Sequence, residues 1–349
     1  MKKILILIFF YIFQNSLQGQ TVEKFDSSFV YKIIKNKEDT VKAIFDWVAS
    51  NIDYDVEMLK TGNYPTPKES LNYVWLNKKG VCAHYAELFN AFCRKAGVQS
   101  YIVSGLVKIE GKISEGGHAW NVIKIKGKWL CFDPTWAAGY INKDIFTRKF
   151  EPDWYAVLPE KFIYTHIPTE TAFQLLEKPL EIQDILAKRK SNLTEKYFFE
   201  DSINTILKLD TFNLMCRELK NLEYCELMLK NSNSKTGICD NSIYIAQGNI
   251  SIHFYNKILE GYKVFFPKPK WKDSEIKTLQ ANMNKALEQA LLFQSRIKNN
   301  DENMHENSIW ITDLKIKIGK MNNFLNKYLA TRRIWRGFVF FIPKYWLFT

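Results

Sequence analysis

Apolar residues follow two different periodicities along the chain, and the change divides it into two parts. In the first part, residues 83–96 place apolar side chains on one face of a helix that ends before Gly97. Strands are predicted at residues 100–109, 118–125 and 128–134. Between the last two strands, Lys126-Gly127 is typical of a tight hairpin turn. We therefore expect an α+β fold with a helix packed on an antiparallel sheet.

In the second part, apolar residues recur at steps of three and four residues, which is the period of a helix. One series is Ile276, Leu279, Met283, Ala286, Ala290, Phe293 and Ile297. The other is Leu314, Ile318, Met321, Leu325 and Tyr328. Two long helices are expected, in a bundle within the chain rather than in a partner-binding coiled coil, because few heptads are sustained. We place the first domain at residues 20–180 and a helical domain at residues 181–349.

Length and composition agree with two packed domains. The chain has 349 residues, of which 46% are hydrophobic and 15% aromatic. This length exceeds that of one typical domain, and the apolar content is sufficient for a core.

The first residues have the pattern of a secretory signal peptide. Met1-Lys2-Lys3 precedes ten apolar residues, Ile4 to Phe13, and a cut is predicted after Gly19. A membrane anchor is the competing interpretation, but a bilayer span needs about 20 apolar residues. We therefore expect residues 1–19 to be removed and the protein to be exported to the periplasm or the extracellular space.

Positive charge is concentrated at the C-terminal end. The chain has a formal net charge of +12, and residues 315–349 hold eight Lys or Arg and no Asp or Glu, interleaved with aromatic residues. Such a segment suits an anionic surface, such as membrane headgroups or a cell-wall polymer. A solvated helix face followed by a tail packed on the core is an equal alternative. Nucleic acid is not expected as a partner, because no binding motif is present.

The six cysteines show no spacing typical of a metal site, and the chain has no glycine-rich phosphate or dinucleotide motif. We expect neither a metal nor a cofactor. Cys93 and Cys131 fall at core positions. Because export permits disulfides, a pair among Cys216, Cys225 and Cys239 is left open.

Cys82 follows Gly80-Val81 and falls on the first turn of the predicted helix. The free N–H groups and the positive end of the helix dipole favour a thiolate there. The same N–H groups could hold an oxyanion during acyl transfer. Taken alone, a cysteine at a helix start is more often a buried structural residue.

His118 and Asp133 change that interpretation. A two-residue hairpin loop pairs Ile125 with Lys128. The same register places His118 diagonally across from Asp133, about 7 Å away at Cβ. A carboxylate on one imidazole nitrogen fixes the tautomer and leaves the other nitrogen for a thiol. Separately, His118 could be a surface histidine and Asp133 a turn residue, but the Cys…His…Asp order makes coincidence a poor explanation.

With these residues in view, the chain resembles the transglutaminase-like superfamily of papain-type Cys-His-Asp proteins, in the branch that includes the kyphoscoliosis peptidase and its bacterial relatives. The resemblance covers about residues 38–180. Its motifs are Ala43-Ile44-Phe45-Asp46-Trp47-Val48, Asn51-Ile52-Asp53-Tyr54-Asp55, Gly80-Val81-Cys82, Val103-Ser104-Gly105, His118-Ala119-Trp120-Asn121, Asp133-Pro134-Thr135-Trp136, Gly139-Tyr140, Phe162-Ile163-Tyr164-Thr165-His166-Ile167-Pro168 and Gln174-Leu175-Leu176.

The resemblance implies a papain-like core with Cys82 as nucleophile, His118 as base and Asp133 as orienting acid. It also implies a cysteine acyl-transfer enzyme that acts on amide or peptide bonds of a protein or cell-wall peptide. Hydrolysis is expected first and amine transfer, which gives a crosslink, second. A catalytically silent binding or scaffolding module is the alternative. His84 departs from the family pattern of a small residue two places after the cysteine, and could crowd the cleft or add a titrating group.

Overall fold

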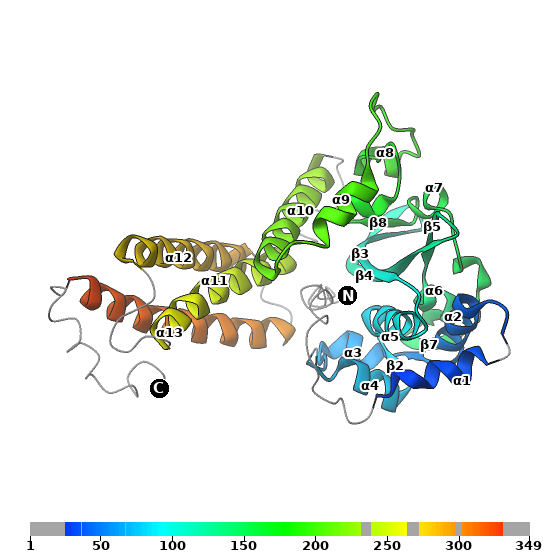
Figure 1. The fold of residues 1–349 in the computed structure, drawn as a ribbon, viewed down its shortest axis with the longest axis horizontal. Helices are drawn as coiled ribbons and strands as arrows, with labels where there is room; N and C mark the ends of the chain where they lie inside the picture. The colour runs from blue at the N-terminus through cyan, green and yellow to red at the C-terminus, as the bar shows by residue number, and fades with distance from the viewer. Residues whose placement is uncertain are drawn as a thin grey trace. The chain divides into compact units, whose positions relative to one another are not determined.

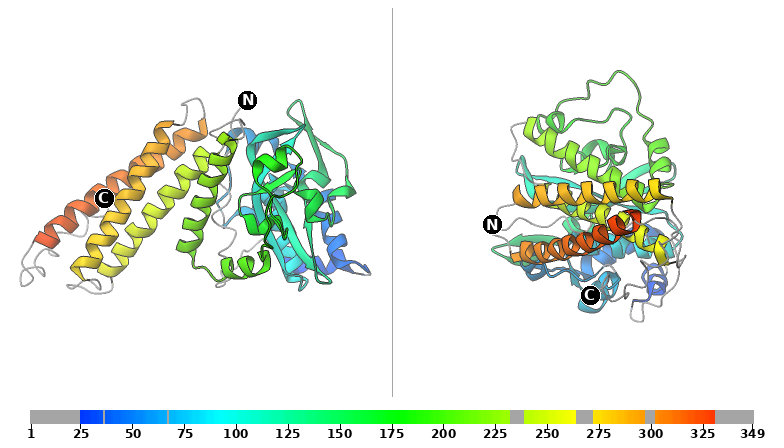
Figure 2. Two further views of the ribbon diagram at one scale, coloured as in Figure 1. Left: turned by 90° about the horizontal axis from the view of Figure 1, so that it is seen from above. Right: turned by 90° about the vertical axis from the view of Figure 1, so that its left-hand side faces the viewer.

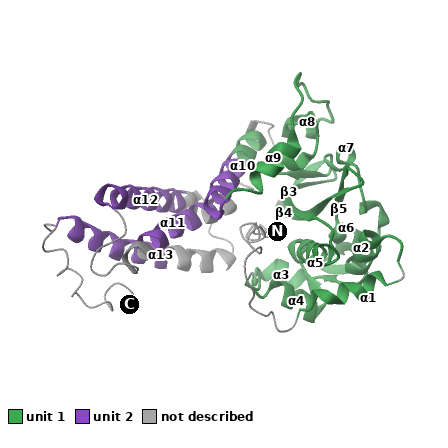
Figure 3. Cartoon of the chain, viewed as in Figure 1, with its two compact units in different colours: residues 1–209, 224–238 green, residues 210–223, 239–349 purple. Residues whose placement is uncertain are grey.

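The computed structural model describes residues 25–35, 37–66, 68–231, 239–263, 272–296 and 302–330. The predicted signal peptide at residues 1–19 and the last part of the basic end, residues 331–349, lie outside these ranges. The chain forms two compact units, which Figure 3 distinguishes by colour: residues 1–209 with 224–238, and residues 210–223 with 239–349. Within the described ranges, every helix is too short or too polar to cross a membrane.

The first unit opens with short helices and one pair of very short strands. In chain order these are η2 (Ser27–Phe29), α1 (Val30–Ile34), α2 (Thr40–Asn51), β1 (Asp53–Tyr54), α3 (Val56–Thr61), α4 (Ser70–Asn77) and β2 (Lys79–Gly80). Aspartates cap three of these helices, because the carboxylates of Asp26, Asp39 and Asp55 accept hydrogen bonds from backbone N–H groups of the first turn of η2, α2 and α3. Strands β1 and β2 pair in parallel, and β2 leads through Val81 into helix α5 (Cys82–Lys95).

A four-stranded antiparallel sheet follows, with the order β5-β4-β3-β8 (Figure 1). Its strands are β3 (Ser100–Ile109), β4 (Lys112–Ile125), β5 (Lys128–Phe132) and β8 (His166–Pro168). The predicted pairing of Ile125 with Lys128 is confirmed. Lys126 and Gly127 both have positive φ, 48° and 81°, as a two-residue hairpin turn of type I′ requires. The expected α+β class, with a helical region toward the C-terminus, is thus confirmed.

A bulge interrupts β4 just before His118. Leu106 pairs with Gly117, but Lys108 pairs with Ile113, so two steps along β3 correspond to four along β4. Extra residues in one strand bend it and change the direction of the side chains that follow. Gly116 and Gly117 lie in this segment, where a backbone without side chains bends most easily.

The chain between β5 and the second unit consists of short elements. They are α6 (Pro134–Ala138), β6 (Gly139–Asn142), β7 (Ile145–Arg148), η3 (Pro152–Trp154), α7 (Pro159–Phe162), η4 (Thr171–Gln174), α8 (Ile182–Leu186) and α9 (Phe199–Ile206). Two contacts tie the last helices to the sheet. Lys108 Nζ donates to the carbonyl of Ile185 at 3.2 Å, and Lys124 forms an ion pair with Glu200 at 2.7 Å. The sheet unit therefore continues beyond residue 180, where the domain boundary was expected.

Helix α5 is at the centre of the first unit. It contacts strands β3 and β4 of the sheet and helices α2 and α4. Phe89 and Phe92 on α5 are fully buried together with Phe45 of α2 and Phe132 of β5. Cys93 and Cys131 are also buried, as expected of core residues. The extensive burial of α5 fixes the position of Cys82 at its first residue.

The second unit consists of helices α11 (Asp240–Lys263), α12 (Asp273–Arg296), α13 (Glu302–Ala330) and the first part of α10 (Thr211–Asn231). Figure 2 shows α11, α12 and α13 lying alongside one another. The predicted apolar series are buried from Ile276 to Ala290 and from Leu314 to Tyr328, while the side chains of Phe293 and Ile297 lie outside the described residues. Cys216 and Cys225 are free thiols, so the disulfide left open for the second half is not formed.

We expect the stability of the first unit to depend on the protonation of Glu87, a carboxyl group on α5. Burial raises the pKa of Glu87 to about 7, although a hydrogen bond from the Ser70 hydroxyl opposes the shift. The unfolded chain has a glutamate pKa of about 4.3, so the native state loses stability as pH rises from that value through the folded pKa. Glu87→Gln should therefore raise the free energy of unfolding by about 1–3 kcal/mol at about pH 8.5, with no gain at about pH 4.

Urea denaturation at both pH values measures this effect. Glu110→Gln is the matched control, because Glu110 is exposed in the turn between β3 and β4. An equal gain from Glu87→Gln at both pH values would contradict the prediction.

Candidate active site

Cys82 is the first residue of α5, as predicted, and 8% of its surface is exposed. The helix begins without a polar N-cap residue, since Val81 occupies that position. Instead, the His84 ring accepts a hydrogen bond at Nδ1 from the Val81 N–H, at 3.2 Å. This is the back-bond of a capping box, with imidazole in the place of a carboxylate.

His84 is therefore a capping residue of α5. It is buried, and burial lowers its pKa to about 4, which keeps the ring neutral. Gly80 leaves room for the ring, because a Cβ at that position would lie 2.6 Å from the His84 Cβ. His84 does not line the cavity at Cys82.

Tyr54 approaches Cys82 through the parallel pair of short strands. Tyr54 of β1 is the partner of Gly80 of β2, two residues before Cys82. Burial raises the pKa of Tyr54 well above its ordinary value, and the charge of a Cys82 thiolate adds to the shift. A hydrogen bond between the phenol oxygen and the Cys82 backbone N–H acts in the opposite direction. Tyr54 and Cys82 line the same cavity.

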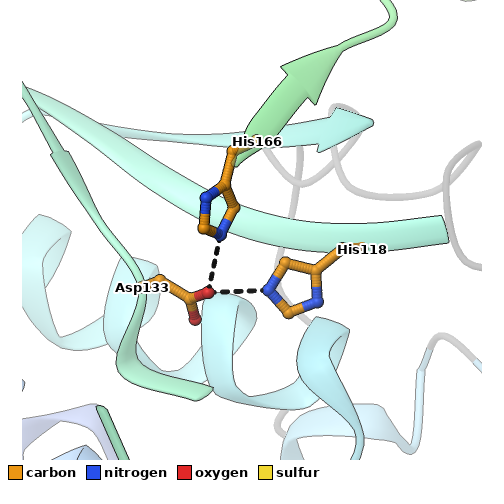
Figure 4. Close-up of side chains that lie close together, drawn as sticks. All are labelled: His118, Asp133 and His166. Atoms are coloured by element: carbon orange, nitrogen blue, oxygen red, sulfur yellow. Dashed lines mark hydrogen bonds and ion pairs between the residues drawn. The ribbon is translucent and has the colours of Figure 1, made fainter. Parts of the chain in front are cut away.

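His118 lies on β4 directly after the bulge and faces Asp133, as predicted. Its Nε2 donates to Asp133 Oδ2 at 2.7 Å (Figure 4). The ring's other nitrogen, Nδ1, is not bound by Asp133, and Cys82, which lines the same cavity, contributes to raising the His118 pKa. The structure therefore brings the three predicted site residues together.

Asp133 is fully buried and accepts four hydrogen bonds. Oδ1 accepts from the backbone N–H groups of Thr135 and Trp136, at 2.8 and 3.0 Å, so Asp133 is the N-cap of α6. Oδ2 accepts from His118 and also from Nε2 of His166, at 3.0 Å. The residue is both a helix cap and the partner of two histidines.

The charges of this cluster favour an imidazolium at His118. Burial alone would lower the pKa of His118, but the Asp133 carboxylate and the Cys82 thiol raise it to about 10. Burial would raise the pKa of Asp133, but the two histidines hold it far below its usual range. Burial lowers the pKa of His166 to about 4, so that ring is neutral. One charged histidine and one neutral histidine thus share a single carboxylate oxygen.

Cys82 and His118 open onto a cavity of about 520 Å³. Its walls are mostly apolar or aromatic and come from several elements, among them Ile109 of β3, Tyr140 and Ile141 of β6, and Trp154. Ile109, Tyr140 and Ile141 are also exposed to solvent, so the cavity opens through an apolar rim. A concave site with mostly apolar walls and a few polar groups is typical of ligand pockets.

In the part of the chain that the structure describes, one group of residues has the donor types and spacing to hold a metal ion: His118, Asp133 and His166. Their ligand atoms lie within 4.8 Å of one another. The two nitrogen–oxygen distances of 2.7 and 3.0 Å are those of hydrogen bonds, and all three residues are buried. We therefore interpret the cluster as a hydrogen-bonded network.

A family profile described as the transglutaminase-like superfamily matches residues 28–134. The chain contains a transglutaminase-like domain. The matched range includes α5 with Cys82, the bulged strand with His118, and Asp133 at its end.

Two curated relatives of this domain are kyphoscoliosis peptidases. The protein of Mus musculus is 31% identical over 153 residues, which cover 42% of this chain and 23% of the relative. The protein of Homo sapiens is 30% identical over 153 residues, with the same coverage. The chain therefore spans about a quarter of the length of these relatives. A solved structure of a TGase is 23% identical and covers 35% of this chain and 34% of its own, with a TM-score of 0.26.

Sequence reasoning missed two residues of this site. Tyr54 and His166 both lie within motifs that carry the family resemblance, but no role followed from their local sequence. The signal that could have singled out His166 is its own motif, which places a histidine among aromatic residues.

We expect the three histidines of the transglutaminase-like domain to differ in charge at neutral pH. His118 should be doubly protonated, because its pKa is raised to about 10, whereas His84 and His166 should be neutral, because burial lowers theirs to about 4. The chain has only five histidines, so their ring nitrogens can be assigned by ¹⁵N NMR of labelled full-length protein. A His118 ring that loses its charge near the ordinary histidine pKa of about 6.5 would contradict the prediction.

Proposed function

We propose that the protein is a cysteine acyl-transfer enzyme that acts on amide or peptide bonds, with Cys82 as nucleophile, His118 as base and Asp133 as orienting acid. The observation that carries this proposal is the position of His118. One ring nitrogen is held by Asp133 at 2.7 Å, and the other is left for the thiol of Cys82 in the same cavity. A thiol with a fixed base beside it is an activated nucleophile.

In the proposed first step, the Cys82 thiolate attacks the carbonyl carbon and forms a carbon–sulfur bond, while the carbonyl π electrons move to oxygen. When this tetrahedral intermediate collapses, the carbon–nitrogen bond breaks and His118 Nδ1 gives its proton to the leaving amine. The product is a thioester on Cys82. Asp133 stays ionised throughout, because its four hydrogen bonds favour the carboxylate.

The oxygen of the intermediate needs donors close to Cys82. The Cys82 N–H at the start of α5 is one, since the first N–H groups of a helix have no acceptor within it, and it would exchange its hydrogen bond with the Tyr54 oxygen for one to the intermediate. We assign the Tyr54 hydroxyl as the second, because Tyr54 lines the cavity together with Cys82 and its strand pairs with the one that leads into α5. Burial keeps its pKa high, so the phenol retains the proton that it donates.

In the second step, His118 takes a proton from a water molecule or an amine, which then attacks the thioester and releases Cys82. Water gives hydrolysis, and a lysine amine gives a crosslink. We favour hydrolysis, as the name of the relatives, kyphoscoliosis peptidase, supports. The substrate we propose is a protein or cell-wall peptide with an apolar side chain at the rim formed by Ile109, Tyr140 and Ile141.

Two parts of this proposal come from the sequence. We propose export to the periplasm or the extracellular space, from the pattern of residues 1–19, and contact of the basic residues 315–349 with an anionic surface. The alternative function is a catalytically silent binding module. Incubation with cell-envelope extracts, with Cys82→Ala as control, separates the two, because mass spectrometry should find new peptide ends or amine adducts only with an enzyme.

Substitution of the three site residues should affect turnover in a defined order. On the substrate found in such extracts, Cys82→Ala and His118→Ala should lower kcat by about 10⁴-fold or more. Asp133→Asn should leave about a hundredfold more activity than these variants, since it misorients the base without removing it. Asparagine also remains a good N-cap, so α6 is kept while the acceptor of two histidines is lost.

Asp133→Ala is the matched control, since it removes both the cap and the acceptor. Thermal unfolding should separate it from Asp133→Asn, because loss of a cap costs about 1 kcal/mol. Wild-type turnover by Cys82→Ala would show that the nucleophile is wrongly assigned.

Tyr54→Phe should lower kcat by about 10²-fold and leave KM nearly unchanged, because an oxyanion donor acts in the transition state. Steady-state kinetics on the same substrate measure both constants. Tyr140→Phe is the control, since this hydroxyl also belongs to a residue of the cavity wall but lies on the exposed rim. Equal effects of the two substitutions would rule out the assigned role of Tyr54.

A further inference from the structure

His166 is a fully buried histidine whose partner is the carboxylate oxygen that also binds His118. Its Nε2 lies 3.0 Å from Asp133 Oδ2, and His118 Nε2 lies 2.7 Å from the same atom (Figure 4). We propose that His166 is a positioning residue that fixes the Asp133 carboxylate and, through it, the orientation of His118. The inference rests on the proposed function, because positioning matters only if His118 acts on Cys82.

The hydrogen bond determines which nitrogen of His166 carries the proton. An ionised carboxylate only accepts, so His166 Nε2 must donate to Asp133. In the neutral ring, Nδ1 is then an acceptor, and it lies 2.9 Å from the Thr165 hydroxyl. That hydroxyl also lies 3.0 Å from the carbonyl of Phe162, so its one proton has two acceptors within reach. Burial, which lowers the His166 pKa to about 4, agrees with a neutral ring.

Aromatic side chains hold the His166 ring in place. Phe162 is stacked on it, with ring centroids 3.8 Å apart and planes inclined by 16°. The rings of Trp136, Trp120 and Trp154 lie at 4.5, 5.1 and 5.4 Å. A ring enclosed in this way cannot turn without moving its neighbours, so the direction of the Nε2–H bond is fixed.

The backbone of His166 is equally constrained. Strand β8 pairs with β3, where His166 is the partner of Val107. Next to it, Gly105 is the partner both of Pro168 on β8 and of His118 on β4. A Cβ at Gly105 would lie 2.0 Å from the carbonyl oxygen of Ile167. Glycine thus allows the close approach that brings the strands of both histidines to one point.

With His166 present, both oxygens of Asp133 have two donors each. Without His166, Oδ2 would have His118 as its only hydrogen-bond donor. The Asp133 carboxylate could then tilt and change the orientation of the His118 ring. The charge of Oδ2 would also be less dispersed, so it would hold the His118 imidazolium more strongly. The titratable groups around Asp133 and His118 are Cys82 and Tyr85 on α5 and His166 on β8.

A purely structural role for His166 is the competing explanation. His166 does not line the cavity, so contact with substrate is not part of either explanation. If the residue served only to fill the aromatic cluster, phenylalanine would replace it well. If it served to donate to Asp133, glutamine would replace it better, because the glutamine amide nitrogen reaches about as far as Nε2.

The experiment compares His166→Phe with His166→Gln in the full chain. The probe is iodoacetamide, and the reading is the rate of alkylation of Cys82 at a series of pH values, followed by peptide mass spectrometry. His166→Phe should lower the rate at neutral pH by about tenfold to a hundredfold, as loss of a supporting hydrogen bond does elsewhere. In His166→Phe, the change in alkylation rate that accompanies loss of the His118 proton should also occur at higher pH than in the wild type. His166→Gln should restore most of the rate and the wild-type pH profile.

Each outcome separates this role from the proposed function. Wild-type rate and pH profile in His166→Phe would overturn the role of His166 and leave the proposed function standing. Equal losses in both variants, with equal loss of thermal stability, would overturn it in favour of a structural role. If Cys82 reacts no faster in the wild type than in His118→Ala, the proposed function and the role of His166 are both overturned.

If His166→Phe does not fold, the tautomer in wild-type protein decides. The ¹⁵N spectrum should show His166 protonated at Nε2 and bare at Nδ1. A ring protonated at Nδ1 with a bare Nε2 could not donate to Asp133, and would overturn the inference.

Discussion

The geometry of the site depends on the buried carboxylate of Asp133. An ionised group without solvent contact is stable in a protein only when its charge and its lone pairs are compensated. The compensation here comes from three elements: the first N–H groups of α6, His118 on β4 and His166 on β8. Because each donor is fixed by backbone structure, the carboxylate joins a helix start and two strands at one point. The hydrogen bonds that make the buried charge tolerable are thus the ones that direct His118 toward Cys82.

This arrangement requires backbones to approach one another closely, and glycines permit it. Gly105 lies on β3 between the strands that carry His118 and His166, with no room for a side chain. Gly116 and Gly117 lie in the bulge just before His118, where β4 has two more residues than its partner. The bulge bends the strand next to the cavity and so sets the direction of the His118 ring. The glycines of this region are therefore part of the site although they contribute no chemical group.

The sequence predicted the parts of the site that depend on local signals. Cys82 at a helix start and the register between β4 and β5 follow from residues close in the chain, and both were found. Tyr54 and His166 did not follow, because their strands have only two and three residues and show no periodicity. Their roles arise from pairing with distant segments: His166 is 33 residues from Asp133. For His84 the sequence left open a role in crowding the cleft or in adding a titrating group, but its ring turns back to cap α5, since Gly80 leaves space there.

Two histidines on one carboxylate oxygen raise the question of which of them is the base. Distance to Asp133 does not decide it, because 2.7 and 3.0 Å are both good hydrogen bonds. The surroundings of each ring decide it. His166 is fully buried among aromatic side chains, away from solvent, and this burial lowers its pKa to about 4. His118 lies beside the Asp133 carboxylate and Cys82, which together raise its pKa to about 10 although burial opposes the shift. A single carboxylate balances one imidazolium, so the charged ring is the one beside the thiol, and a neutral His166 can act only through Asp133.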